Sequence, residues 1–236
     1  MRLADLGGKR VALLGFGREG RAVHAALRRR LPWLPLTIFC EQEPTDRSAL
    51  DPHADRLVVG PLMAPELRRF EVLVKSPGIS LYHPAVAAAR AAGVHVTSGT
   101  NLWFAEREGE TTICVTGTKG KSTTASLIAA MLAAAGRRAV LGGNVGVPMI
   151  ELLETRADVW VIELSSYQIA DLKAQPGLGV LLNLYADHLD WHGDFDTYQR
   201  DKLRLLSLAG RALVNRDCAH LAPPLTPTAG FNDPAG

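Results

Sequence analysis

The sequence predicts an α/β protein made of two units that each begin with a strand. Short apolar runs rich in Val, Leu and Ile alternate with alanine-rich amphipathic stretches, as in βα units around a mostly parallel sheet. One glycine-rich turn follows a strand at Gly15, and a second follows a strand at Gly117. We therefore expect a Rossmann-like parallel-sheet domain over residues 1–98 and a phosphate-loop type of α/β domain over residues 99–236.

The composition excludes several classes of protein. With 236 residues, 47% of them hydrophobic, the chain can bury one large core or two modest ones, and ordinary domain sizes favour two. The formal net charge is only +2 with dispersed basic residues, so no nucleic-acid partner is expected. Cys40, Cys114 and Cys218 are too far apart for a zinc site or a disulfide scaffold. No apolar run is long enough for a bilayer and residues 1–10 lack a signal-peptide core, so we expect a cytoplasmic protein without a membrane partner.

The first domain is predicted from five strand-like runs and two helical stretches. Helices are expected after Glu19 and after His83. The strands are expected at Arg10–Leu14, Leu36–Cys40, Leu57–Val59, Val72–Lys75 and Val94–Thr97.

The first glycine-rich turn, Gly15-Phe16-Gly17-Arg18-Glu19-Gly20, has the G-x-G-x-x-G spacing between a strand and a helix. In this fingerprint the backbone N–H groups approach a diphosphate, and an acidic residue about 20 positions further on binds a ribose hydroxyl. Glu41 stands at about that distance. A diphosphate ligand is expected, although NAD, FAD and a UDP-sugar all suit the turn, and the glycines could also serve only to turn the chain.

The second domain is predicted to begin with the strand Thr111–Thr116, after a joint near residues 99–109. A helix is expected from about Lys121 to Ala135, with Gly136 ending it. Its apolar residues at helical spacing are Leu127, Ile128, Met131, Leu132 and Ala135. The Pro-, Gly- and Thr-rich residues Pro223–Gly236 are predicted to form a loop or a cut end.

The second turn, Thr116–Thr123, is a phosphate-binding loop that ends in Gly-Lys-Ser. The general pattern requires glycine where Val115 stands, so this is a shorter variant. Backbone N–H groups and the helix N-terminus can hold phosphates, Lys121 can reach the β and γ phosphates, and Ser122 can bind Mg²⁺. The alternative is a lysine that only caps a loop. The nucleotide-binding residues are expected to be Gly117, Thr118, Lys119, Gly120, Lys121, Ser122 and Thr123.

Two further positions are candidates for metal binding. Glu163 ends the apolar strand Val159–Leu164, and its carboxylate with Ser122 would suit Mg²⁺, unless it is a solvated strand-end residue. His188 and His192 lie four residues apart among aspartates, as in some zinc sites, but no third ligand of zinc type follows at a typical spacing.

With these motifs in view, the sequence resembles the Mur ligases, whose ATP loop has the form Thr-Gly-Thr-x-Gly-Lys-Ser/Thr. Further segments, residues 142–146, 163–168 and 183–193, occur in the family's order and spacing. The Glu163-Leu-Ser-Ser-Tyr-Gln168 segment is similar to the member that adds D-glutamate, as is Ser76-Pro77-Gly78-Ile79 in the first domain. The match extends from about Val11 to Asn215.

The resemblance implies that the first turn binds the UDP of a substrate and not NAD. The residues implied for this site are Gly15, Gly17, Arg18, Glu41 and Ser76. The sequence departs from the family where Glu41 replaces a frequent aspartate and Glu43 a frequent arginine.

In the second domain the resemblance implies two Mg²⁺ ions and a lysine carbamate. A lysine on an amphipathic helix is ordinarily a solvated charge, but Lys202, on a helix expected to open with an Asp196–Gln199 capping box, matches the family lysine that reacts with CO₂. The implied roles are catalytic for Lys121, His188 and Lys202, metal-binding for Ser122, Glu163, His188 and Lys202, and substrate-binding for Asn144, Ser165 and Gln168, with His192 a packing or loop residue.

The implied function is the ATP-dependent ligation of D-glutamate to UDP-N-acetylmuramoyl-L-alanine in peptidoglycan synthesis, by a monomer and through an acyl phosphate. The family's C-terminal domain is not recognised in the sequence and the central domain looks shortened, so we expect the 236-residue chain alone to be inactive. The alternatives are a non-catalytic UDP-sugar-binding fragment and another Mur or folylpolyglutamate-type ligase. A nicotinamide-dependent oxidoreductase would leave Lys121, Glu163 and His188 without a purpose.

Overall fold

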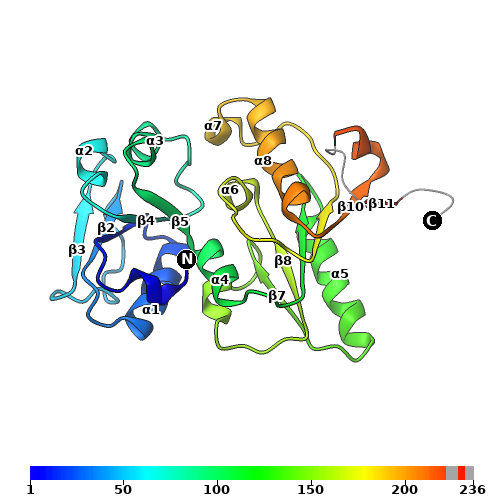
Figure 1. Ribbon diagram of the computed structural model, residues 1–236, viewed down its shortest axis with the longest axis horizontal. Coiled ribbons are helices and arrows are strands. Elements are labelled where there is room, and N and C mark those ends of the chain that lie inside the picture. The colour runs from blue at the N-terminus through cyan, green and yellow to red at the C-terminus, as the bar shows by residue number, and fades with distance from the viewer. Residues whose placement is uncertain (222–227, 232–236) are drawn as a thin grey trace. The chain divides into compact units, whose positions relative to one another are not determined.

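The computed structural model describes residues 1–221 and 228–231 and consists of two compact units. Unit 1 contains Met1–Glu106 together with Pro148–Leu153, and unit 2 contains Arg107–Val147 together with the chain from Glu154 onward. Each unit has its own parallel sheet, which confirms the predicted fold class (Figure 1). Within the described parts of the chain, no helix is long and apolar enough to span a bilayer.

Unit 1 is a five-stranded parallel sheet with the strand order β3-β2-β1-β4-β5. Its strands are β1 (Val11–Leu14), β2 (Leu36–Cys40), β3 (Asp55–Val59), β4 (Val72–Lys75) and β5 (His95–Ser98). Strand β1 lies between β2 and β4, with Val11 beside both Leu36 and Val72. The chain therefore changes direction across the sheet at β1, and the turn after β1 lies at the switch point where doubly wound sheets bind ligands.

The helices of unit 1 are α1 (Arg18–Arg30), α2 (Ala64–Leu67), α3 (Pro84–Ala91) and α4 (Gly99–Glu106), with two 3-10 helices, η1 (Leu3–Leu6) and η2 (Met149–Leu152). Helix α4 corrects the boundary expected after residue 98, because it contacts α1 and η2 within unit 1. Its Leu102 and Trp103 are completely buried. The burial of these two apolar side chains explains why α4 belongs with the first sheet.

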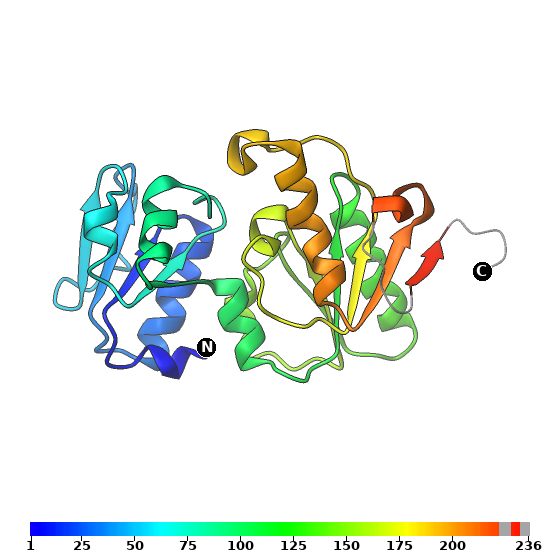
Figure 2. The same ribbon diagram turned by 45° about the horizontal axis from the view of Figure 1, so that its top comes forward.

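Unit 2 is a six-stranded parallel sheet with the order β11-β10-β9-β6-β8-β7. Its strands are β6 (Thr112–Thr116), β7 (Ala139–Gly143), β8 (Val159–Glu163), β9 (Leu178–Leu181), β10 (Arg211–Asn215) and β11 (Thr228–Phe231), and its helices are α5 (Lys121–Ala134), α6 (Ser166–Ile169), α7 (Leu189–His192), α8 (Phe195–Leu208) and the 3-10 helix η3 (Arg216–Leu221). Figure 2 shows α8 and α5 on opposite faces of this sheet.

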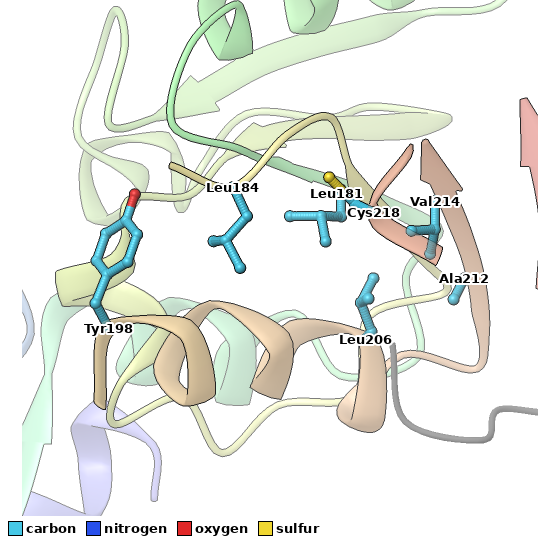
Figure 3. Packing of buried hydrophobic residues seen from close by; sticks show 7 residues of the cluster. All are labelled: Leu181, Leu184, Tyr198, Leu206, Ala212, Val214 and Cys218. Atoms are coloured by element: carbon cyan, nitrogen blue, oxygen red, sulfur yellow. The ribbon is translucent and has the colours of Figure 1, made fainter. Parts of the chain in front are cut away.

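Side chains that alternate along the strands separate the two cores of unit 2. Leu181 and Val214 pack with Leu206 of α8 on one face, in the cluster drawn in Figure 3. Val180 of β9 and Ala125 of α5 pack together on the other face. This period of two is what a strand buried on both sides requires.

Three local predictions need correction. The apolar stripe of α5 is narrower than the five residues predicted from helical spacing, because Leu127 and Met131 are 58% and 63% exposed and only Ile128 and Leu132 of the five pack against the sheet. Helix α8 begins after Asp194, whose carboxylate accepts the Thr197 N–H at 2.7 Å, so the expected Asp196 capping box does not form.

The third correction concerns the predicted loop Pro223–Gly236. Within it, residues 228–231 form strand β11, because their backbone pairs in parallel with Ala212–Asn215 of β10. Residues 222–227 and 232–236 lie outside the described part of the chain.

Candidate functional site

In unit 1, the first glycine-rich turn lies at the carboxyl end of β1. Gly15 has a φ of 86°, which favours glycine, and its carbonyl accepts the Ser76 hydroxyl at 3.2 Å. A Cβ at Gly20 would overlap that same Gly15 carbonyl, so α1 can approach the turn only with glycine there. Gly17 is the N-cap of α1, which directs the positive end of the helix dipole at this turn.

The structure places the remaining predicted residues of this site at its rim. Arg18 and Glu41 are both exposed. Glu41 directly follows β2, and the Gly15 N–H donates to Phe39 of that strand at 2.8 Å, so the ends of β1 and β2 are adjacent. Ser76 and the end of β2 thus both lie beside the turn.

Sequence reasoning missed two charged residues beneath this turn. Glu19 and Lys75 line a cavity of about 10 Å³, enough for about one water molecule. Lys75 is 1% exposed at the end of β4, and burial raises the pKa of Glu19. The signal available in the sequence was a lysine that ends an apolar strand directly before Ser76.

In unit 2, the phosphate-binding loop connects β6 to the N-terminus of α5. Gly120 is the N-cap of α5 with a φ of 82°, so the loop requires glycine there. The Asn183 side chain, which sequence reasoning did not single out, braces the loop: its oxygen accepts from the Thr118 and Lys119 N–H groups at 3.0 and 2.9 Å. Its amide group donates to the Lys119 carbonyl at 3.0 Å. Asn183 therefore fixes the loop from the end of β9.

Two lysines donate to carbonyl groups of the same loop. Lys121 Nζ bonds to the Thr118 oxygen at 3.0 Å, and Lys202 Nζ bonds to the Gly117 oxygen at 2.6 Å. Lys202 is only 2% exposed. Burial, with Lys121 as a nearby positive charge, lowers the pKa of Lys202 to about 7, against the attraction of Asp187 and Glu163. An unprotonated amine is therefore accessible to Lys202 near neutral pH.

Glu163 lies beside the start of α5. It is 1% exposed, and its carboxylate accepts from Ser122 Oγ at 2.6 Å and from Asn144 Nδ2 at 2.7 Å. A buried carboxylate next to a hydroxyl oxygen is a donor set that Mg²⁺ favours, so these residues fit one magnesium ion. Gly143 is required here, because a Cβ on it would overlap the Glu163 carbonyl.

A cavity of about 250 Å³ separates the phosphate-binding loop from α6, α7 and α8. Six of the predicted site residues line it, namely Thr118, Lys121, Asn144, Ser165, His188 and Lys202. As an amine, Lys202 is no metal ligand, so a second metal ion fits these residues only after Lys202 has become an anion. Among the described residues, no cluster of three or more His, Cys, Asp and Glu side chains could hold a metal ion.

Two further residues from the sequence motifs, Gln168 and His192, are buried and hydrogen-bonded within unit 2. Gln168 is buried, and its side-chain oxygen accepts from the Ser165 N–H and hydroxyl at 3.0 and 3.1 Å in a capping box at the start of α6. His192 is also buried, and it bonds to Asp201 and Ser166 in addition to packing against neighbouring rings.

A doubly wound unit 1 with a glycine-rich turn and a phosphate-loop unit 2 define the class of two-domain α/β proteins in which each domain has a glycine-rich turn between a strand and a helix. Residues 9–98 match the model of the Mur ligase MurD-like N-terminal domain, and residues 115–225 match the Mur ligase middle domain. The chain belongs to the Mur ligase family.

Three named relatives and one solved structure give the extent of the similarity. The chain is 47% identical to a UDP-N-acetylmuramoyl-L-alanine--L-glutamate ligase of Xanthomonas axonopodis pv. citri, with 100% of the chain matching 54% of that protein. Proteins of the same name from Xylella fastidiosa and Micromonospora are 46% and 42% identical, over 96% and 91% of the chain and 51% and 47% of their own lengths. The chain thus spans about half the length of the curated relatives that it matches.

The solved structure of UDP-N-acetylmuramate:L-alanyl-gamma-D-glutamyl-meso-diaminopimelate ligase from Neisseria meningitides matches 94% of the chain and 77% of its own chain. The TM-score is 0.53 and the identity is 22%. This likeness supports the fold.

Proposed function

We propose that the full-length protein containing this chain is an ATP-dependent ligase that joins glutamate to UDP-N-acetylmuramoyl-L-alanine. One observation carries the proposal: the phosphate-loop lysine Lys121 and the buried Lys202, whose pKa is lowered to about 7, line one cavity together with Asn144, which bonds to the buried carboxylate of Glu163. A ligase needs such a site, because the substrate carboxylate and the γ phosphate are both anions and must be brought into contact. The names of relatives at 42–47% identity support the same activity.

The reaction begins when a substrate carboxylate oxygen attacks the γ phosphorus of ATP and ADP leaves, which gives an acyl phosphate. The amine of glutamate then attacks the acyl carbon, and phosphate departs as the amide forms. Lys121 and the N–H groups of the Gly117–Gly120 loop would hold the transferring phosphate and stabilise its developing charge. Bound between Glu163, Ser122 and the phosphates, Mg²⁺ would supply further charge neutralisation.

Lys202 is proposed to be carbamylated. CO₂ reacts only with an unprotonated amine, and the pKa of about 7 leaves much of Lys202 in that form. The nitrogen attacks the carbon of CO₂ and loses a proton to solvent, which leaves a carbamate anion. This anion would lie near the Lys121 cation and, with His188, would complete the donor set of a second metal site.

Unit 1 is proposed to bind the UDP part of the substrate. The N–H groups at the start of α1 and the Gly15–Gly20 turn suit a diphosphate. Ser76, which bonds to Gly15, and the exposed Glu41 after β2 are proposed to contact the ribose and base. We also propose that the enzyme is a cytoplasmic monomer, since its proposed substrates are soluble and one chain supplies the cavity.

The configuration of the glutamate is proposed to be L. D-glutamate was expected from the Glu163–Gln168 segment, but all the relatives named above are L-glutamate ligases. These names outweigh the local resemblance, because the compared proteins match along nearly the whole chain.

The test is phosphate release by the full-length protein with ATP, Mg²⁺ and UDP-N-acetylmuramoyl-L-alanine, with either L- or D-glutamate. We expect turnover that depends on L-glutamate and on the UDP-substrate, with a Lys121→Ala variant as the inactive control. Preference for D-glutamate would overturn the proposed configuration. Tight binding of the UDP-substrate without glutamate-dependent phosphate release would favour a non-catalytic binding protein.

A further inference from the structure

His188 has a strained backbone at the edge of the cavity. Its φ of 53° and ψ of 36° are left-handed, and no other non-glycine residue among those described has a positive φ. A side chain with a Cβ disfavours this conformation, and histidine adopts it only where the surroundings impose it. Something around His188 must therefore hold it.

The helix that follows is too short to hold this conformation alone. The His188 carbonyl accepts the N–H groups of Trp191 and His192 at 3.1 and 3.2 Å, which forms the single turn of α7. An isolated turn of this length is unstable in water. The ring of His188 lies edge-on to Tyr167 at 5.1 Å, and Tyr167 stacks on Trp191 at 4.6 Å. Ring contacts have no fixed donor and acceptor, so alone they would not fix the position of α7.

The His192 side chain fastens the turn to two other helices. Its Nδ1 lies 2.7 Å from Asp201 Oδ2 on α8, and its Nε2 lies 2.9 Å from Ser166 Oγ on α6. The carboxylate can only accept, so Nδ1 donates its proton to Asp201, and Nε2 shares the second hydrogen bond with the Ser166 hydroxyl. All three residues are at least 96% buried. Buried hydrogen bonds of this kind fix geometry, because breaking them leaves polar groups without water.

The same Ser–His–Asp order occurs in hydrolases, but the environment here argues against a nucleophile. Ser166 is 2% exposed and its hydroxyl is bonded to the ring. The three residues are better placed to join chain segments: Asp201 directly precedes Lys202, and Ser166 lies between Ser165 and Tyr167.

We propose that His192 is a positioning residue whose bonds to Asp201, Ser166 and the His188 carbonyl hold His188 in its left-handed conformation and fix α6, α7 and α8 around the cavity. The inference rests on the proposed function, because only a reacting group at the cavity makes the position of His188 matter for turnover. Neither packing nor a loop position alone accounts for three hydrogen bonds from one buried histidine.

The first experiment uses the 236-residue chain without metal or nucleotide. Nitrogen-15 NMR of the imidazole groups should show His192 as the Nδ1-protonated tautomer, with a slowly exchanging ring proton. In Ser166→Ala, which removes one bond with little change in volume, that proton should exchange at least tenfold faster. A ring protonated only at Nε2, or an unchanged exchange rate in Ser166→Ala, would overturn the proposed hydrogen bonds of His192 to Asp201 and Ser166, whatever the protein catalyses.

The second experiment measures glutamate-dependent phosphate release by the full-length protein. His192→Phe keeps the ring packing and loses both side-chain bonds, so we expect kcat to fall at least hundredfold with the KM for ATP changed less than threefold. Asp201→Asn keeps an acceptor for Nδ1 and should stay within tenfold of the wild type. Ser166→Ala, which should fold even if His192→Phe does not, should lower kcat about tenfold.

Leu206→Val is the matched control, because Leu206 is buried on the same helix but packs against Val214 and not against the cavity. It should match the wild-type kcat although it lowers thermal stability. Wild-type kcat in His192→Phe and Ser166→Ala would overturn the positioning role. If the wild type itself shows no turnover, the proposed function fails. The NMR result still decides whether His192 forms its bonds to Asp201 and Ser166.

Discussion

Asp55, at the start of β3, is a completely buried carboxylate held by a cluster of donors. It bonds to His24 Nε2 and to the Asp51 N–H, each at 2.8 Å, and to Arg28. Burial raises its pKa, but the bonds from Arg28, Asp51 and His24 outweigh this effect and leave the pKa below the ordinary value of 3.8. The paired charge therefore stabilises unit 1.

We predict that Asp55→Asn lowers the free energy of unfolding by roughly 3 kcal/mol at pH 7, because Arg28 loses its buried partner. Because the pKa of Asp55 is lower in the folded than in the unfolded protein, its ionised carboxylate stabilises the fold fully above the unfolded pKa of about 3.9. This stabilisation is lost as the pH falls through the folded pKa. The difference in the free energy of unfolding between Asp55→Asn and the wild type, measured with urea, should thus become smaller below pH 4. Asp158→Asn is the control, since Asp158 pairs with Arg138 at the surface and should change stability by less than about 1 kcal/mol. Equal losses in both variants would contradict this account.

Lys202 gives a second prediction at the scale of one residue. Lys202→Ala should lower turnover of the full-length protein at least hundredfold, and bicarbonate should not restore it, whereas a small carboxylic acid should restore part of it. Lys202→Arg should be equally inactive, because a guanidinium keeps the charge and stays protonated. Carbon-13 NMR with labelled bicarbonate should show a carbamate signal in the wild type only. Near-normal turnover in Lys202→Ala would show that the lysine has no catalytic part.

At the scale of single elements, the strand and turn predictions succeeded because they depend on local sequence. Both glycine-rich turns lie where they were expected, since glycines beside apolar strands have few other uses. The stripe of α5 was predicted too wide, because alanines surround Leu127, Ile128, Met131 and Leu132 and leave the spacing without a clear polar boundary. Strand β11 was missed because an edge strand needs only backbone partners.

The contacts within the site could be predicted only in part, for a related reason. The role of Lys121 follows from its own motif. The bonds of His192 to Asp201 and Ser166 join three helices and depend on how those helices pack, which spacing along the chain does not encode. The brace from Asn183 to the phosphate-binding loop crosses from β9 to β6 in the same way.

Helix α5 provides the test of its corrected orientation. Leu127→Ala should change the free energy of unfolding by less than about 0.5 kcal/mol, because Leu127 is 58% exposed. Ile128→Ala should cost roughly 2 kcal/mol, because Ile128 packs against the core that contains Val115 and Val161. The two variants share helix, size and replacement, so urea unfolding compares burial alone. A larger loss for Leu127→Ala would show that Leu127 and not Ile128 lies on the buried face of α5.

At the scale of the whole molecule, two units with separate glycine-rich turns should respond separately to ligands. In amide hydrogen exchange on the 236-residue chain, UDP-N-acetylmuramoyl-L-alanine should protect residues 15–20 and 76–78 of unit 1. ATP with Mg²⁺ should protect residues 117–123 of unit 2. NAD serves as the control and should protect neither. Protection of residues 15–20 by NAD and not by the UDP-substrate would reverse the assignment of unit 1.

The short segment Pro148–Leu153 determines what happens when the chain is cleaved between the two units. The chain leaves unit 1 after Glu106, returns for these few residues between β7 and β8, and leaves again. Met149 and Ile150 are 2% and 1% exposed, so unit 1 takes part of its interior from a segment that lies between two stretches of unit 2 along the chain. A single cleavage after Glu106 therefore does not separate the two units, because residues 148–153 of unit 1 stay on the second piece. We expect residues 1–106 and 107–236, co-expressed as separate polypeptides, to purify together as a split protein, whereas replacing Met149 and Ile150 with serine should let them part.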